Sequence, residues 1–212
     1  VHLPLAGFQQ DPSLAGLRRL LAKGGAVAEV LQPSCADPDR PYPLTPQQQA
    51  IWLLHHSNPT SKAYLAEATI WFRGEFSASA MQAALNDSFA RHEIYRTVFG
   101  ETDGTPWQKV LPVQHRKLRQ VDCTSLPEAE RDAKLAGLFR DALPHIADLS
   151  SVPPARFLLV RFAPDLHALL HQEHHIIHDG WGGNVFTDEV VRHYRNRVDD
   201  SYEYAPGPAV QY

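Results

Sequence analysis

The part of this sequence where chemistry is most concentrated holds four histidines within eight residues: His171, His174, His175 and His178. Imidazole changes its charge near neutral pH and also binds transition metals, so the cluster predicts either proton transfer or a metal site. His174 and His175 are adjacent and come directly before the segment IIHDGWGG. Adjacent side chains at the end of a strand point in opposite directions, so only one of this pair can face a cleft while the other packs.

The residues that follow the histidine pair predict a tight turn. Asp179 can hold this turn by ion pairing with an arginine, and Gly180 can supply a backbone angle that other residues resist. We therefore expect both residues to be architectural.

The flanking sequence predicts a core strand before the motif and a helix after it. Two apolar runs, 156–162 and 166–173, surround Ala163, Pro164 and Asp165, which indicates a hairpin. From Gly183 onward the apolar residues recur at helical spacing. The motif is thus expected in a loop at a strand–helix junction, where a rigid support presents side chains to a cleft.

The rest of the chain alternates between helical and strand patterns. Two capping boxes are predicted, Thr45 with Gln48 and Ser125 with Glu128. The expected elements are helices over 11–21, from Thr45 to about His56, over 79–90 and after Ser125, and strands over 66–72, 95–99 and 107–111, the last two joined by a turn at Asp103 and Gly104. This order predicts an α/β chain built as an α+β two-layer sandwich.

Composition excludes several classes of protein. The formal net charge is −4, without the basic surplus that phosphate contacts require, so nucleic acid is not an expected partner. Cys35 and Cys123 are too few and too far apart for a disulfide framework or a zinc site, which favours a reducing, cytoplasmic compartment. No run approaches the roughly 20 apolar residues of a spanning helix, and the first residues have no signal-peptide pattern, so neither membrane insertion nor secretion is expected.

Three motifs resemble, in order and spacing, those of the condensation domains of nonribosomal peptide synthetases. HHIIHDG, from His174 to Gly180, has that family's active-site pattern HHxxxDG, and Trp181 follows as it does in the family. RHEIYRTVF, from Arg91 to Phe99, is similar to RHExLRTxF, with Tyr95 in place of Leu. LTPQQQAIW, at residues 44–52, is similar to SxAQxRLW.

The resemblance implies a fold and a set of site residues. It covers about residues 42–212 and implies the N-terminal lobe of the chloramphenicol acetyltransferase-like fold, one of two lobes that enclose a tunnel, with the C-terminal lobe absent here. His175 is then the catalytic residue, acting as a base or as a positioner of the amine. The implied supporting residues are His174, Asp179, Gly180, Trp181 and Arg91.

The resemblance also implies a reaction and its partners. The reaction is amide bond formation between a carrier-bound acyl or peptidyl thioester donor and a carrier-bound aminoacyl acceptor. The implied partners are upstream donor and downstream acceptor carrier proteins with their phosphopantetheine arms, the missing lobe and a neighbouring adenylation domain. The chain itself is expected to bind neither a cofactor nor a metal, and an isolated fragment is expected to be inactive.

The predicted domains are three. Residues 1–24 are expected to be either the C-terminal end of a carrier protein or a helical leader, 25–43 a Pro-rich linker, and 44–212 the lobe itself. Gly182 stands where the family often has Ser, and Thr45, Ile51 and Ala147 also depart from its pattern, which leaves the condensation subtype open. The intact HHxxxDG argues against the heterocyclising relatives.

Two other hypotheses remain. HQEHH contains the HxxHH spacing of membrane di-iron oxygenases, with Glu173 nearby, but such enzymes need several histidine boxes on transmembrane helices. His171 and His178 are therefore interpreted as a polar strand residue and a loop residue instead of metal ligands. A noncatalytic interaction lobe of a synthetase is the other alternative.

Overall fold

The computed structural model describes residues 11, 13–23, 40–59, 61–141, 148–150, 153–199 and 202. The chain divides into two compact units, residues 1–36 and 37–212. In the first, α2 (Leu14–Lys23) begins after Ser13, whose Oγ accepts a 3.0 Å hydrogen bond from the N–H of Gly16. The helix predicted over 11–21 is thus confirmed, with its start set by this cap.

The domain boundaries stay predictions. Residues 24–39, which include most of the predicted Pro-rich linker over 25–43, lie outside the described residues. The same holds for Cys35 and Ala147.

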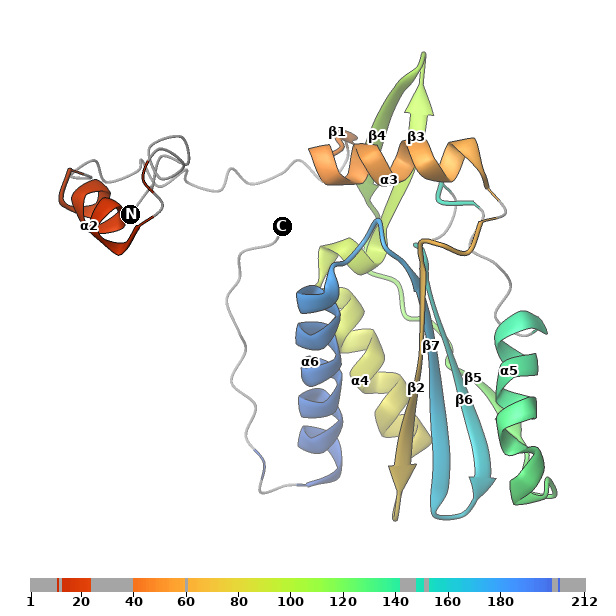
Figure 1. Ribbon diagram of the computed structural model, residues 1–212. Helices are drawn as coiled ribbons and strands as arrows, with labels where there is room; N and C mark the ends of the chain where they lie inside the picture. Colours follow the sequence, from red (N-terminus) through yellow and green to blue (C-terminus); the bar gives the residue numbers. More distant parts are fainter. Residues whose placement is uncertain are drawn as a thin grey trace. The chain divides into compact units, whose positions relative to one another are not determined.

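A four-stranded sheet is the centre of the second unit (Figure 1), in the order β2-β7-β6-β5. Its strands are β2 (Leu65–Arg73), β7 (Leu166–His174), β6 (Ala155–Ala163) and β5 (Arg119–Asp122). The β6–β7 pair is the predicted hairpin, β2 pairs antiparallel with β7, and β5 lies parallel to β6. All nine residues of β7 are buried, because this strand lies between two others and both of its faces are covered.

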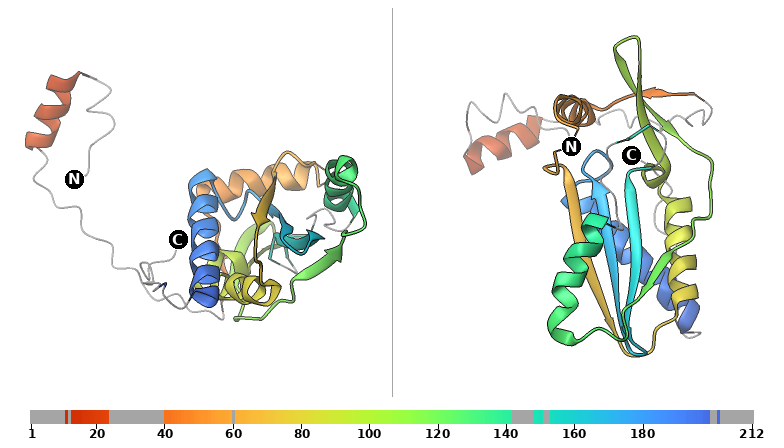
Figure 2. Two further views of the ribbon diagram at one scale, coloured as in Figure 1. Left: turned by 90° about the horizontal axis from the view of Figure 1, so that it is seen from below. Right: turned by 90° about the vertical axis from the view of Figure 1, so that its right-hand side faces the viewer.

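Helices cover the two faces of this sheet. Figure 2 shows α4 (Ala78–Arg91) and α6 (Gly180–Val198) side by side on one face and α5 (Arg131–Asp141) on the other. Alternate residues of β6 and β7 point to the two sides, so that Leu159 and Leu169 pack with Phe186, whereas Leu158 and Leu170 pack in a second cluster. The predicted mixed helix-and-sheet class is confirmed, and the helix predicted after Ser125 corresponds to α5, which lies on the second face.

A smaller sheet and one helix lie at the end of the large sheet where β7 finishes (Figure 1). The small sheet has the order β1-β4-β3, formed by β1 (Tyr42–Pro43), β4 (Thr105–Val110) and β3 (Thr97–Thr102). Its hairpin turns at Asp103 and Gly104, whose φ angles of 51° and 75° fit a two-residue turn. The short 3₁₀ helix η1 (Glu93–Arg96) precedes β3, which therefore starts later than the predicted residue 95.

The helix α3 (Pro46–Ser57) confirms the first predicted capping box. The Thr45 side chain accepts from the N–H of Gln48, and the Gln48 side chain accepts from the N–H of Thr45. The second predicted box is wrong. A 3₁₀ turn, η2 (Glu128–Glu130), follows Pro127 without a side-chain cap, and α5 begins only at Arg131. Proline disfavours the helical conformation in the residue before it, so Pro127 opposes a helical Leu126, which would be the first residue of a helix capped at Ser125.

Candidate active site

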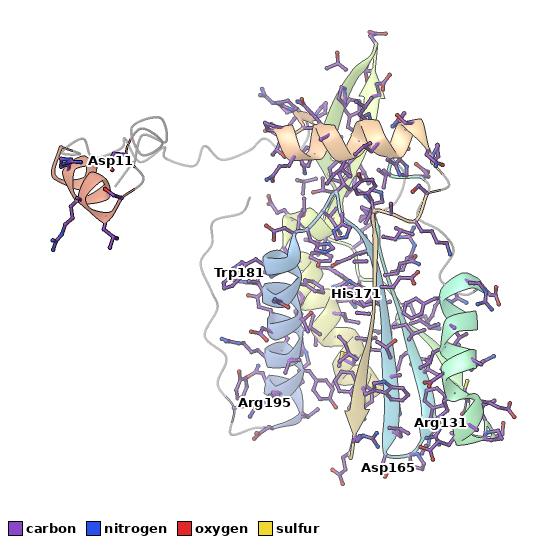
Figure 3. All side chains as sticks on the ribbon, in the orientation of Figure 1. Asp11, Arg131, Asp165, His171, Trp181 and Arg195 are labelled. Carbon is purple, nitrogen blue, oxygen red and sulfur yellow. The ribbon has the colours of Figure 1, made fainter. Side chains whose placement is uncertain are left out.

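The four polar residues His171, Gln172, Glu173 and His174 end strand β7, whose earlier residues are apolar apart from His167, and all four are buried. Their side chains alternate between the faces of the sheet, so His171 and Glu173 lie on the side of α6. Figure 3 labels His171 within the layer between the strands and α6. Buried polar groups are costly unless they are paired, so this end of β7 must supply partners for each of them.

The two adjacent histidines differ in their surroundings. His174 is 2% exposed, its ring lies edge-on to His55 of α3 at 5.0 Å between centroids, and its Nδ1 accepts a hydrogen bond from the N–H of Ile176. His175 begins the turn after β7, donates its backbone N–H to the carbonyl of Tyr64 at 2.8 Å, and is only partly buried. The arrangement fits the expectation that one ring packs and the other is accessible.

Asp179 caps the helix that follows the motif. Its Oδ1 accepts a 2.7 Å hydrogen bond from the N–H of Gly182, and its carbonyl accepts one from Gly183. The helix begins at Gly180, three residues before the predicted Gly183, because this cap satisfies N–H groups of the first turn. Gly180 is not among the glycines with positive φ, so the special backbone angle expected there is not needed.

Arg91, the arginine among the expected supporting residues, pairs with a different carboxylate. Arg91, at the end of α4, donates from Nε to Glu189 of α6 at 2.7 Å, and His92 contacts the other oxygen of the same carboxylate. Within the described residues no ion pair joins Asp179 to an arginine, so the expected pairing is not found in this part of the chain. Arg91 instead ties α4 to α6, which agrees with an architectural role.

Trp181 is 79% exposed and lies at the start of α6 on its outer side (Figure 3). Its predicted support of the site is therefore not a packing contact within the described part of the chain, and it remains a prediction.

Glu173 is the centre of a buried polar cluster. One oxygen accepts from the Tyr95 hydroxyl at 2.8 Å and lies 2.9 Å from Nε2 of His171, while the other oxygen lies 3.0 Å from Nδ1 of His178. Burial raises the pKa of Glu173, but the contacts with His171 and His178 outweigh it and hold the pKa well below its ordinary value. The carboxylate is thus ionised in the folded protein. Burial and the nearby carboxylate raise the pKa of Tyr95, which keeps its proton.

His175 lies beside this cluster. Its ring centroid is 4.8 Å from that of His178, with 32° between the two planes. Burial lowers the pKa of His175, the charge of His178 lowers it further, and Glu173 acts in the opposite direction. The imidazole is therefore neutral at neutral pH and can accept a proton.

A family model described as a condensation domain matches residues 39–209. The chain belongs to the condensation domain family. A probable nonribosomal peptide synthetase from Salinispora arenicola is 35% identical over the whole chain, and a dimodular nonribosomal peptide synthase from Bacillus subtilis is 32% identical over the same extent. The chain spans only 3% and 9% of the length of these two relatives.

Solved condensation domains have the same fold. The starter condensation domain of rhizomide synthetase matches with a TM-score of 0.70 and 21% identity, over 79% of this chain and 40% of that one. The first condensation domain of the calcium-dependent antibiotic synthetase, in complex with a substrate analogue, matches with a TM-score of 0.68 and the same coverage. The predicted chloramphenicol acetyltransferase-like fold is thus confirmed, for a part of the length of these domains.

Two residues that matter in this condensation domain were not singled out from the sequence as site residues. Glu173 was noted only beside a metal motif, and Tyr95 only as a departure from the family's Leu. The signal for Glu173 was its strand register, since His171 and Glu173 are two apart and share a face. For Tyr95 it was the phenol itself, because a hydroxyl in an apolar position requires a buried partner.

The structure of this condensation domain also bears on the alternative classes. Among the described residues, no three histidine, cysteine, aspartate or glutamate side chains converge as metal ligands. In the described part of the chain, none of the helices has both the length and the apolar character needed to cross a membrane.

Proposed function

We propose that this chain supplies the HHxxxDG half of an active site that joins a carrier-bound acyl or peptidyl thioester to a carrier-bound aminoacyl group in nonribosomal peptide biosynthesis. The contrast between buried His174 and partly exposed His175 supports this proposal most directly. Of this pair, only the imidazole of His175 is partly exposed, at the end of β7 and before a helix that Asp179 caps.

The reaction does not require a strong base to deprotonate the amine before it attacks, but it requires a group that accepts the proton afterwards. An α-amino group has a pKa near 8, so on the order of a tenth of it is already neutral at neutral pH. Its nitrogen attacks the donor carbonyl, the C–N bond forms, and the tetrahedral intermediate carries an ammonium. His175 takes the proton or holds the amine in line, the C–S bond breaks, and the phosphopantetheine thiolate leaves and is protonated. Such a group contributes roughly 10²- to 10⁴-fold to a rate.

The first turn of α6 contributes less to oxyanion stabilisation than its position suggests. The N–H of Gly182 is bound to the Asp179 carboxylate, and that of Gly183 to the Asp179 carbonyl. At the glycine-rich start of the helix, this leaves the N–H groups of Gly180 and Trp181 to stabilise an oxyanion. The negative charge of the adjacent Asp179 carboxylate repels such an oxyanion. The site therefore depends chiefly on placing the amine.

The proposed partners follow from this chemistry. They are upstream donor and downstream acceptor carrier proteins, each with a phosphopantetheine arm, together with an adenylation domain that loads the acceptor and a second lobe that completes the tunnel. The chain itself needs no bound cofactor or metal for this reaction, and the proposed compartment is the cytoplasm.

The test is single-turnover amide formation by the complete domain with both loaded carrier proteins. We expect His175→Ala to reduce the rate by at least roughly 10²-fold while the melting temperature stays near that of the wild type. His193→Ala is the control. His193 lies on α6 thirteen residues after Gly180, the first residue of the helix, so it is roughly 20 Å from the helix start near which His175 lies. Full activity of His175→Ala in an active domain would leave the noncatalytic interaction lobe as the better hypothesis.

A further inference from the structure

His178, the residue before Asp179, is enclosed although the family motif leaves its identity open. Its side chain is 7% exposed, and its Nδ1 lies 3.0 Å from Oε1 of Glu173. The approach departs from the line of a good hydrogen bond, so the attraction is mainly electrostatic. A Cβ at Gly183 would lie 3.5 Å from Cδ2 of this ring, so the first turn of α6 closes over it.

The remaining side of the His178 ring faces His175. The two centroids are 4.8 Å apart with 32° between the planes, a tilted stack in which the rings touch without a hydrogen bond between them. His175 is anchored through its backbone N–H to Tyr64, but its side chain is partly open to solvent. An exposed imidazole samples several rotamers, and a ring packed against one face restricts this sampling.

We propose that His178, held in place by the buried carboxylate of Glu173, is a positioning residue that fixes the orientation of the His175 ring. This rests on the proposed function, in which His175 meets the acceptor amine. Orientation matters because a misplacement of about 1 Å at a reacting group costs as much as 10²-fold in rate.

The same contacts also set the charge state of His175. The ionisable groups that act on it are His178 from the turn and Glu173 from β7, whereas His55 of α3 contacts the ring of His174 instead. Removing the His178 ring exposes His175 to water and removes the neighbouring charge that opposes its protonation. Both changes raise the pKa of His175, so the acidic limb of the rate profile should move to higher pH.

His178→Asn in the complete domain is the main test, because asparagine keeps a polar N–H group near the Nδ1 position and removes the ring. We expect kcat to fall about 10- to 100-fold, the KM for the loaded acceptor carrier to stay unchanged, and the midpoint of the acidic limb to rise. His193→Asn is the matched control. It removes a histidine of α6 whose Nδ1 lies 3.8 Å from the carboxylate of Asp87 on α4. Because this histidine lies far along α6 from the turn that carries His175, the change should leave all three quantities unchanged.

A second measurement is made on the wild-type domain and needs no His178 variant. With histidine rings labelled, and His175 assigned by the signal lost in His175→Ala, we expect a nuclear Overhauser contact between the ring protons of His175 and His178, and a His175 pKa below that of a free imidazole. The absence of this contact overturns the proposal even if a His178 variant fails to fold.

The outcomes separate this inference from the function on which it rests. If the wild-type domain forms no amide, or if His175→Ala retains full activity, the proposed function fails and the role of His178 falls with it. If the wild type is active, His175→Ala is not, and His178→Asn matches the wild type in kcat and in its acidic limb, only the positioning role is overturned.

Discussion

The hydroxyl of Tyr95 donates a 2.8 Å hydrogen bond to Glu173, and these two residues lie 78 positions apart in the chain. Tyr95 belongs to the segment RHEIYRTVF, and Glu173 directly precedes the histidine pair. The bond therefore fixes the strand end that carries His175 to the start of the small sheet. The Tyr95 ring also stacks on Phe186 of α6 at 3.8 Å between centroids, so three segments meet at this residue.

Tyr95→Phe should destabilise the fold without removing the ring stack. The change leaves one oxygen of a buried carboxylate without its hydroxyl donor, which costs about 1–3 kcal/mol. Urea denaturation of the wild type and the variant measures this difference. Trp107→Phe, which removes a donor that bonds the hydroxyl of Thr102 at an exposed position, is the control and should cost less. Equal stability of Tyr95→Phe and the wild type would contradict the structural role of this bond.

The stability should fall at acidic pH through Glu173. Its folded-state pKa lies below the unfolded value of 4.5, so its stabilisation is present above that pH and is lost as the pH falls below it. The free energy of unfolding should thus decrease from about pH 5 downward, and Glu173→Gln should flatten this decrease. Denaturant titrations over this pH range measure the slope. Glu101→Gln, at an exposed position of β3, should leave the slope unchanged, and an unchanged slope in Glu173→Gln would show that other carboxylates dominate.

The fold was largely accessible from the sequence because its signals are local. The Thr45 and Gln48 box, the hairpin around Pro164 and the turn at Asp103 and Gly104 each depend on residues close together in the chain. The second capping box failed for a local reason as well, since Pro127 interrupts the helix that Ser125 was expected to start.

The contacts of the site were less accessible, because they join distant segments. Asp179 was expected to pair with an arginine, yet Arg91 is turned toward Glu189 of α6 instead. The Arg91–Glu189 contact depends on how α4 and α6 pack against each other, and no spacing in the sequence specifies that packing. The sequence places His178 in a loop but does not show that its side chain is enclosed. That enclosure requires Glu173 from the strand and Gly183 from the helix at the same time.

Asp179→Ala should cost about 1 kcal/mol, because it removes a helix cap at an exposed position. Breaking a buried ion pair would instead cost about 3–5 kcal/mol, so the two roles differ in magnitude. Asp179→Asn should retain most of the stability, since the amide oxygen still accepts from Gly182. Urea denaturation of both variants decides between a cap and an ion pair, and a loss above about 3 kcal/mol in Asp179→Ala would indicate an arginine partner in the complete domain.

The last prediction is that residues 1–212 alone form no amide at the rate of a complete condensation domain. This chain covers 40% of each of the two matched solved domains, which therefore extend well beyond it. His175 is partly exposed at the end of β7, and the described residues do not enclose it from the other side as a second lobe would. Holding two tethered thioesters in line accounts for much of the expected acceleration, and one wall cannot orient both.

The assay uses the chain with both loaded carrier proteins, first alone and then with a separately expressed downstream half. We expect turnover to appear only when the two halves are combined, and His175→Ala in the combined sample to abolish it. The outer side of α6 exposes Trp181, Val185 and Val191, so light scattering should accompany the assay to detect self-association of the chain alone. Turnover by the chain alone at the rate of the complete domain would show that one lobe is sufficient, because the reactants would then need no second wall to meet at His175.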